Sequence, residues 1–189
     1  MKKTLAFLVL ALLATACNAK PNPQETKPTT NAKTLVVYFS ATGTTKQVAQ
    51  NLAKAIGADL HEIQPLAPYS SADLDWTNKS SRSSVEMNNK SSRPALAASD
   101  FSVKEYDKVF LGFPIWWGTA PRVVQTFLES QDFANKTIIL FATSGSSGMG
   151  STDKDLKSSV DASATILKGK VLNGNPSVEE LKTWAGSFN

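Results

Sequence analysis

Cysteine and histidine are almost absent from this sequence, which holds one of each, Cys17 and His61, among its 189 residues. A single cysteine excludes a disulfide framework, a CxxC redox pair and a metal site built from cysteines. A single histidine argues against a multi-histidine metal centre and against a Ser-His-Asp hydrolase. Glycine (10) and proline (9) are too sparse for a collagen-like or low-complexity protein.

Charge is also sparse, because charged residues make up 19% of the chain and the formal net charge is +4. That excess gives no support for nucleic-acid binding. Hydrophobic residues make up 41%, which is enough to bury a core and argues against a disordered chain. The length suits one domain of ordinary size with an additional segment.

The N-terminus has the pattern of an export signal. Lys2 and Lys3 precede an apolar run, residues 5–16, that is about half as long as the ~20 residues a membrane-spanning helix needs. The run ends in small residues before Cys17, an arrangement that resembles a bacterial lipoprotein signal. The resemblance implies that residues 1–16 are removed and that Cys17 is lipidated, which lowers the formal charge from +4 to +2. The alternative is an ordinary secretory signal cut nearby, with Cys17 incidental.

Residues 18–33 are typical of a tether, since they hold no large apolar side chain and include Pro21, Pro23 and Pro28. At ~3.1 Å per residue in polyproline II, such a segment spans at most ~50 Å. Several acyl chains on Cys17 would anchor it stably, where one chain would not. The expected organisation is therefore a signal peptide (1–16), a tether (17–33) and one globular domain (34–189).

Strand and helix patterns alternate along the globular part. An apolar, β-branched run at residues 35–39 predicts a strand buried on both faces. Further strands are predicted at residues 60–63, 109–113, 137–141 and 165–172. Apolar residues at helical spacing predict helices between them. One should end at Gly57, and another should be opened by Thr119 and Pro121. A third should be capped by Thr152 and Asp155, and the last by Asn175 and Pro176. This α/β alternation implies a parallel sheet with helices on both faces.

Residues 65–101 break this regularity, because they are polar and rich in serine and asparagine. The pentapeptide Asn-Lys-Ser-Ser-Arg occurs twice, at residues 78–82 and 89–93. An eleven-residue offset is about three helical turns, so both copies would share a face if the segment were one helix. The segment is interpreted as a solvated helix and loop, and the alternative is a basic docking face for an acidic redox partner.

Three loops at the predicted carboxyl ends of strands carry unusual residues, at the edge where open parallel sheets bind ligands. The first loop contains Ser40, Thr42, Gly43, Thr44 and Thr45 between a buried strand and a helix. Its hydroxyls, backbone N–H groups and helix dipole suit a phosphate. The loop contains neither the GxxxxGK[ST] nor the GxGxxG motif. It suits a terminal monophosphate group that is bound but takes no part in a reaction.

The second loop contains Pro114, Ile115, Trp116, Trp117 and Gly118. Two adjacent tryptophans cannot both point inward along one strand, so stacking of a planar aromatic ligand on one of them is the economical explanation. The third loop is small and flexible, with backbone that can approach a ring edge closely. Its candidate site residues are Ser144, Gly145, Ser147 and Gly148.

Together, residues 36–45, 106–118 and 141–148 resemble the three cofactor loops of the flavodoxins, in particular a bacterial flavodoxin-like lipoprotein subfamily. The resemblance implies a three-layer α/β/α fold with a five-stranded parallel sheet in the order 2-1-3-4-5. It also implies one non-covalently bound FMN. No catalytic residue and no metal site are expected.

The resemblance assigns a role to each loop. The first would hold the phosphate of FMN, and Trp116, together with Trp117, would stack on the isoalloxazine ring. Pro114, Ile115, Gly118 and the third loop would supply backbone contacts, and a peptide flip at Gly118 would reach the ring N5 in one redox state.

The expected function is that of an FMN electron carrier tethered at the bacterial cell envelope, on the periplasmic or outer surface. Its partner would be a redox protein or a quinone, with the membrane reached through the lipid anchor. One alternative is an FMN-dependent NAD(P)H:quinone-type reductase, and another is a flavin-free binding lipoprotein.

Outside the loops, His61 is expected near the end of the second strand, at the sheet edge, as a surface or half-buried group. Tyr69, Trp76 and Met87 are expected in local packing, Trp184 in the core, and Arg82 paired with Glu86 or approaching the cofactor.

Overall fold

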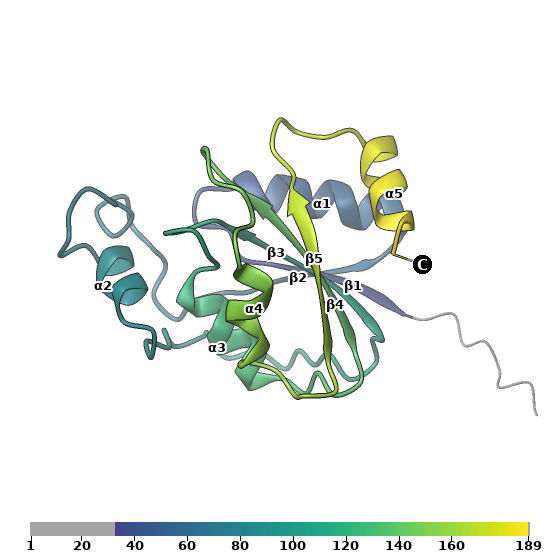
Figure 1. Ribbon diagram of the computed structural model, residues 1–189, viewed down its shortest axis with the longest axis horizontal. Coiled ribbons are helices and arrows are strands. Elements are labelled where there is room, and N and C mark those ends of the chain that lie inside the picture. The colour runs from purple at the N-terminus through teal and green to yellow at the C-terminus, as the bar shows by residue number, and fades with distance from the viewer. Residues whose placement is uncertain (1–32, 189) are drawn as a thin grey trace, which may run out of the picture.

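Five parallel strands form one sheet in the order β2-β1-β3-β4-β5, which confirms the predicted topology (Figure 1). The structure is a computed structural model and describes residues 33–188, so the predicted signal, Cys17 and the predicted tether up to residue 32 lie outside the described residues. The strands are β1 (Thr34–Tyr38), β2 (Asp59–Glu62), β3 (Lys108–Pro114), β4 (Thr137–Thr143) and β5 (Thr165–Val171).

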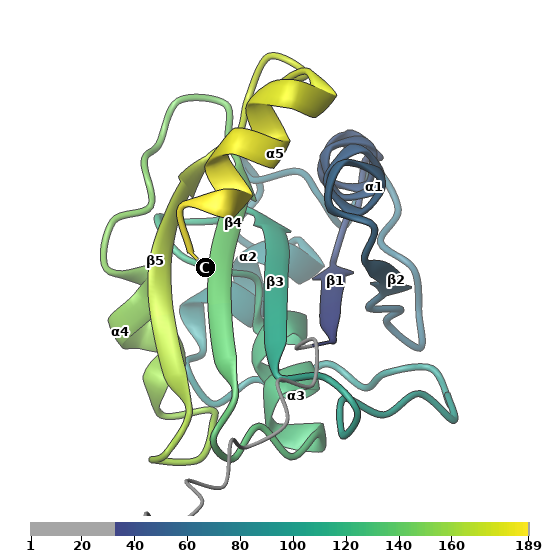
Figure 2. The same cartoon turned by 90° about the vertical axis from the view of Figure 1, so that its right-hand side faces the viewer.

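Helices cover both faces of the sheet, as Figures 1 and 2 show: α1 and α5 lie on one face, and α3 and α4 on the other. The helices are α1 (Thr44–Ile56), α2 (Arg82–Asn88), α3 (Arg122–Ser130), α4 (Thr152–Lys157) and α5 (Val178–Gly186). Successive residues of a strand point to opposite faces, so β1 supplies both cores. Val36 packs toward α1 and α5, while Leu35 and Val37 pack toward α3 and α4. The result is a three-layer α/β/α fold.

Two of the predicted helix starts were wrong. The side chain of Ser177, not Asn175 or Pro176, caps α5, because Ser177 and Glu180 form a capping box that satisfies two backbone N–H groups. Helix α4 begins after Ser151, and the Thr152 hydroxyl donates to the carbonyl of Met149 instead of capping the helix. Gly57 ends α1 as predicted, and the structure shows it in a left-handed conformation.

A lobe, residues 66–95, projects from the carboxyl edge of the sheet and carries α2 (Figure 1). Its two ends are joined where the N–H of Leu66 donates to the carbonyl of Ala95 at 2.8 Å. The pentapeptide repeat does not form one helix. Asn78 and Asn89 each accept a hydrogen bond from the N–H two residues on, at 2.9 and 3.0 Å. Each copy therefore forms the same short turn, one before α2 and one after it.

Both arginines of the repeat are paired with carboxylates. Arg82 contacts Glu86 at 2.7 Å, as expected for residues four apart on a helix, and Arg93 contacts Glu129 at 2.8 Å. These pairs neutralise two of the charges that a basic docking face would need.

Candidate functional site

The first loop, residues 40–45, connects β1 to α1 and is closed by an internal hydrogen bond. The N–H of Gly43 donates to the Ser40 hydroxyl at 3.1 Å, and Gly43 has a φ of 90°, which an L side chain rarely adopts. Thr42 and Thr44 are exposed, and their hydroxyls lie 3.5 Å apart. The first N–H groups of a helix have no partner within the helix, so this loop offers hydroxyls and N–H groups in one place.

Thr45 differs from its neighbours because it is buried. Its hydroxyl lies 2.8 Å from the hydroxyl of Thr143, the last residue of β4. This contact ties the start of α1 to the strand that leads into the third loop. Ligand binding by Thr45 stays a prediction.

The second loop turns tightly after β3. Trp116 and Thr119 exchange backbone hydrogen bonds of 2.9 and 3.0 Å, while Trp117 and Gly118 have φ angles of 49° and 80°. Positive φ at both central residues defines a type I′ turn. Glycine adopts this conformation readily, whereas a bulky residue does so at a cost, which often marks a functional position. The turn therefore holds Trp117 in a strained backbone conformation.

The two tryptophans of this loop have different surroundings. The Trp116 ring packs edge-on against Phe39 and Tyr69, with centroid distances of 5.7 and 5.2 Å. Trp117 is 47% exposed. Trp116 is thus wedged between the sheet and the lobe, and Trp117 presents free ring surface.

The third loop, residues 144–148, follows β4 and is held by a residue that the sequence analysis did not single out. The Asn173 side chain accepts from the N–H of Ser144 at 2.9 Å and donates to the carbonyl of Ser144 at 2.6 Å. Within the loop, the N–H of Ser147 donates to the Ser144 hydroxyl at 2.9 Å. Asn173 follows β5 at the same edge of the sheet, so a search of every strand end would have found it.

Parallel strands place these loops at one edge, and a cavity of about 630 Å³ lies among them. Every residue that lines it is uncharged. The lining residues are Ala41, Thr42, Leu74, Trp76, Ser83, Pro114, Ile115, Trp116, Trp117, Ser144, Gly145, Ser146 and Ser147.

Eight of the predicted site residues line this cavity: Thr42, Pro114, Ile115, Trp116, Trp117, Ser144, Gly145 and Ser147. Six others do not line it: Ser40, Gly43, Thr44, Thr45, Gly118 and Gly148. Thr44 lines a smaller neighbouring cavity of about 420 Å³, which shares Ser144 with the first. The two cavities therefore meet at Ser144.

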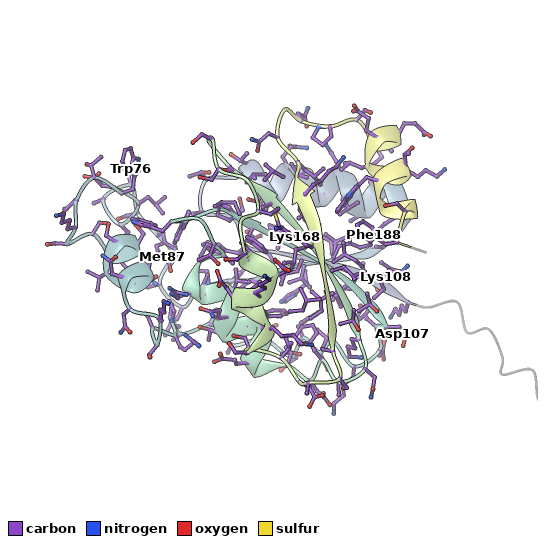
Figure 3. All side chains as sticks on the ribbon, in the orientation of Figure 1. Trp76, Met87, Asp107, Lys108, Lys168 and Phe188 are labelled. Carbon is purple, nitrogen blue, oxygen red and sulfur yellow. The ribbon has the colours of Figure 1, made fainter. Side chains whose placement is uncertain are left out.

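The lobe contributes three residues that were not predicted to belong to the site: Leu74, Trp76 and Ser83. Trp76 was expected in local packing, but it is 74% exposed and lines the cavity. Figure 3 shows it out on the lobe, away from the sheet. The sequence signal for it was weak, because a tryptophan in a polar segment has no periodic context.

Tyr69, Arg82 and Glu86 form a compact group at the base of the lobe. The Tyr69 hydroxyl donates to Glu86 at 2.5 Å, and the Arg82 guanidinium lies 4.0 Å from the centre of the Tyr69 ring. Burial and the hydrogen bond to Glu86 raise the pKa of Tyr69 far above its usual value, so the phenol stays neutral. Tyr69 therefore acts as a fixed support for Trp116. Neither Arg82 nor Glu86 lines the cavity.

His61 lies away from these loops. It is half-buried in edge strand β2, as expected, with its ring stacked 3.6 Å from that of Phe101. It lines a separate cavity of about 500 Å³ beside β2. Within residues 33–188, no cluster of histidine, cysteine or carboxylate side chains could hold a metal ion.

Comparison with known proteins identifies the family. A model of the flavodoxin family matches residues 33–188. A proposed flavoprotein from Bacteroides uniformis is 51% identical, with a TM-score of 0.77, and the match covers 82% of this chain and 98% of that one. A second, from Bacteroides eggerthii, is 45% identical, with a TM-score of 0.77 and coverage of 83% and 98%.

A flavoprotein from Lactobacillus acidophilus, solved in complex with FMN, shares the fold at 18% identity, with a TM-score of 0.59 and coverage of 82% and 99%. Comparison with curated proteins gave no match. The chain belongs to the flavodoxin family.

Proposed function

We propose that the protein binds one FMN at the carboxyl edge of its sheet and transfers electrons at the bacterial cell envelope. One observation carries this proposal: a hydroxyl-rich loop that begins a helix lies beside an uncharged cavity with exposed indole surface. The loop suits a phosphate, and the cavity suits a flat heterocycle.

The residues present fit both parts of FMN, the phosphate and the ring. Thr42, Thr44 and the first N–H groups of α1 would hold the phosphate, with Ser40 and Gly43 keeping the loop curled. This 13-residue helix directs the positive end of its dipole at the same place. The phosphate would need no lysine or arginine.

The ring would occupy the larger cavity. Trp117 offers free indole surface for stacking, while Trp116 fixes the shape of the wall. Pro114, Ile115, Gly118 and the third loop would present backbone groups to the ring edge and ribityl chain. FMN would supply the redox chemistry, and this chain would set its position and environment.

An anchor and the cavity would lie at opposite edges of the sheet. The described chain enters β1 at its amino end, whereas the cavity lies beyond the carboxyl ends of β1, β3 and β4. A lipid on Cys17 would attach the domain to the membrane through the edge of the sheet opposite the flavin. This arrangement favours a protein partner that lies outside the membrane over a partner within the bilayer. No helix among residues 33–188 is long and apolar enough to span a membrane.

Stepwise reduction of the FMN-loaded protein, followed by its visible spectrum, tests the electron-transfer role. A carrier takes up electrons reversibly and shows no steady-state turnover of NADH or NADPH with a soluble quinone. Sustained turnover would favour the reductase instead, and a colourless protein after incubation with FMN would favour a flavin-free binding protein.

Detergent phase partitioning tests the tether. The full-length protein should enter the detergent phase when it is expressed in a bacterium, and Cys17→Ser should move it to the aqueous phase. Equal partitioning of the two would contradict lipidation at Cys17.

A further inference from the structure

The lobe, residues 66–95, and the strand-end loops together line the cavity. The lobe supplies Leu74, Trp76 and Ser83 to the lining, whereas the indole of Trp117 comes from the turn after β3. The cavity therefore has an inner wall made by loops of the sheet and an outer wall made by the lobe.

The lobe is attached firmly to the domain. Tyr69 packs edge-on against Trp116 and Phe39, with centroid distances of 5.2 and 5.7 Å. In α2, the carbonyl of Met87 accepts a hydrogen bond of 3.0 Å from the Arg122 guanidinium, which is only 8% exposed. The lobe thus presents a fixed surface to the cavity.

Two of its residues have unused binding capacity. Trp76 leaves 74% of its surface exposed, although a large apolar ring gains free energy by being covered. Ser83 is only 1% exposed, and its hydroxyl has no hydrogen-bond partner. A buried polar group without a partner costs free energy, which a ligand in the cavity could recover.

We propose that the lobe is the outer wall of the flavin-ring site, with Trp76 covering the ring face that Trp117 leaves open and Ser83 hydrogen-bonding a polar atom at the ring edge. This inference rests on the proposed function. It has a mechanistic consequence: with both faces covered, small oxidants and hydride donors cannot stack on the ring. Walls on both faces would leave only the ring edge for contact with a partner, as suits a carrier.

Titration with FMN and with riboflavin, followed by flavin fluorescence, tests the wall in the intact protein. Trp76→Ala should weaken both ligands about 5- to 10-fold, because it removes a stacking contact with the ring. Trp76→Phe should restore part of the affinity. Thr44→Ala should weaken FMN but leave riboflavin unchanged, because riboflavin lacks the phosphate.

Val85→Ala is the matched control, since Val85 is also an exposed apolar residue of the lobe but does not line the cavity. It should leave both affinities unchanged. Thermal unfolding of the unloaded Trp76→Ala protein should match that of the wild type, because the side chain is mostly exposed. Its affinity loss then cannot come from misfolding.

A second measurement follows reoxidation of the dithionite-reduced, FMN-loaded protein by a soluble naphthoquinone. Two electrons and two protons leave the reduced flavin and convert the naphthoquinone to its hydroquinone. Trp76→Ala should react at least about threefold faster than wild type, because one ring face is then open. A slower reaction would make Trp76 a docking surface for the quinone and would overturn the proposal.

The outcomes distinguish a failure of the proposal for the lobe from a failure of the proposed function. If wild-type protein binds FMN but Trp76→Ala binds it equally well, the lobe is not the outer wall of the flavin-ring site, and the proposed function stands. If wild-type protein binds neither flavin, both fail.

Discussion

The inner and outer walls of the cavity are built in different ways. The inner wall consists of loops that follow β1, β3 and β4, and the positions of these loops are set by the register of buried parallel strands. The outer wall lies in the lobe, where hydrogen bonds of side chains such as Asp73, Asp75 and Asn78 to nearby backbone shape the chain. A regular core thus determines where a ligand can bind, while an irregular segment determines how far it is enclosed.

The largest expected effect is a loss of stability caused by a substitution within the sheet. It tests whether the inner wall depends on the sheet that supports it. A Cβ atom at Gly169 would lie 1.7 Å from the carbonyl oxygen of Leu140, where the β4–β5 register shifts. Gly169→Ala should therefore lower the free energy of unfolding by about 3 kcal/mol or more. Denaturant unfolding measures this loss.

Gly186→Ala is the control, because a Cβ atom at that position in α5 meets nothing within 4 Å. It should change stability by less than about 1 kcal/mol, in the stabilising direction. Similar losses in the two variants would show that the close approach of β4 and β5 does not limit stability.

Asn173→Ala should loosen the inner wall without touching the lobe. It removes two hydrogen bonds to the backbone of Ser144, worth about 1 kcal/mol each. The free energy of unfolding should fall by about 2 kcal/mol. The dissociation constant for FMN should rise about tenfold, because the third loop loses its support. Asn88→Ala, at an exposed position of α2, should change neither, and unaltered FMN affinity in Asn173→Ala would contradict the role of this clamp.

Tyr69→Phe should loosen the outer wall by a smaller amount. The variant loses the hydrogen bond to Glu86 but keeps the ring against Trp116, so stability should fall by about 1 kcal/mol and FMN affinity about threefold. Tyr106→Phe removes a similar bond, to Asp59, at the amino edge of the sheet. It should cost comparable stability and leave FMN affinity unchanged; equal affinity loss in both variants would exclude a specific effect of the lobe.

The smallest effect concerns a region outside both walls. Burial lowers the pKa of His61, so the unfolded chain binds a proton there more readily than the folded one. Stability should therefore fall as the pH drops below about 6.5, the usual pKa of histidine. Because His61 is the single histidine, its ring signals in an NMR titration report this pKa directly. A pKa above the usual value, or an unchanged stability profile in His61→Asn, would contradict the effect of burial.

Most of the inner wall could be predicted from the sequence. Buried runs such as that of β1 identify strands, and residues such as Thr42 and Trp117 follow them directly, so their shared edge follows from parallel topology. The order of the strands came from the family resemblance, since periodicity alone does not determine it.

The outer wall could not be predicted, because no local pattern connects Trp76 or Ser83 with loops far along the chain. Their placement depends on contacts between distant residues, such as Arg122 with Met87. The start of α5 was wrong for a local reason: Ser177 with Glu180 offers a complete capping box, which outcompetes Asn175.

Calorimetric titration of the purified protein with FMN tests the central claim most directly. We expect one site per chain, with a dissociation constant of about 1 µM or tighter, and a much weaker site after Trp117→Ala. No heat of binding at FMN concentrations of about 100 µM would contradict it.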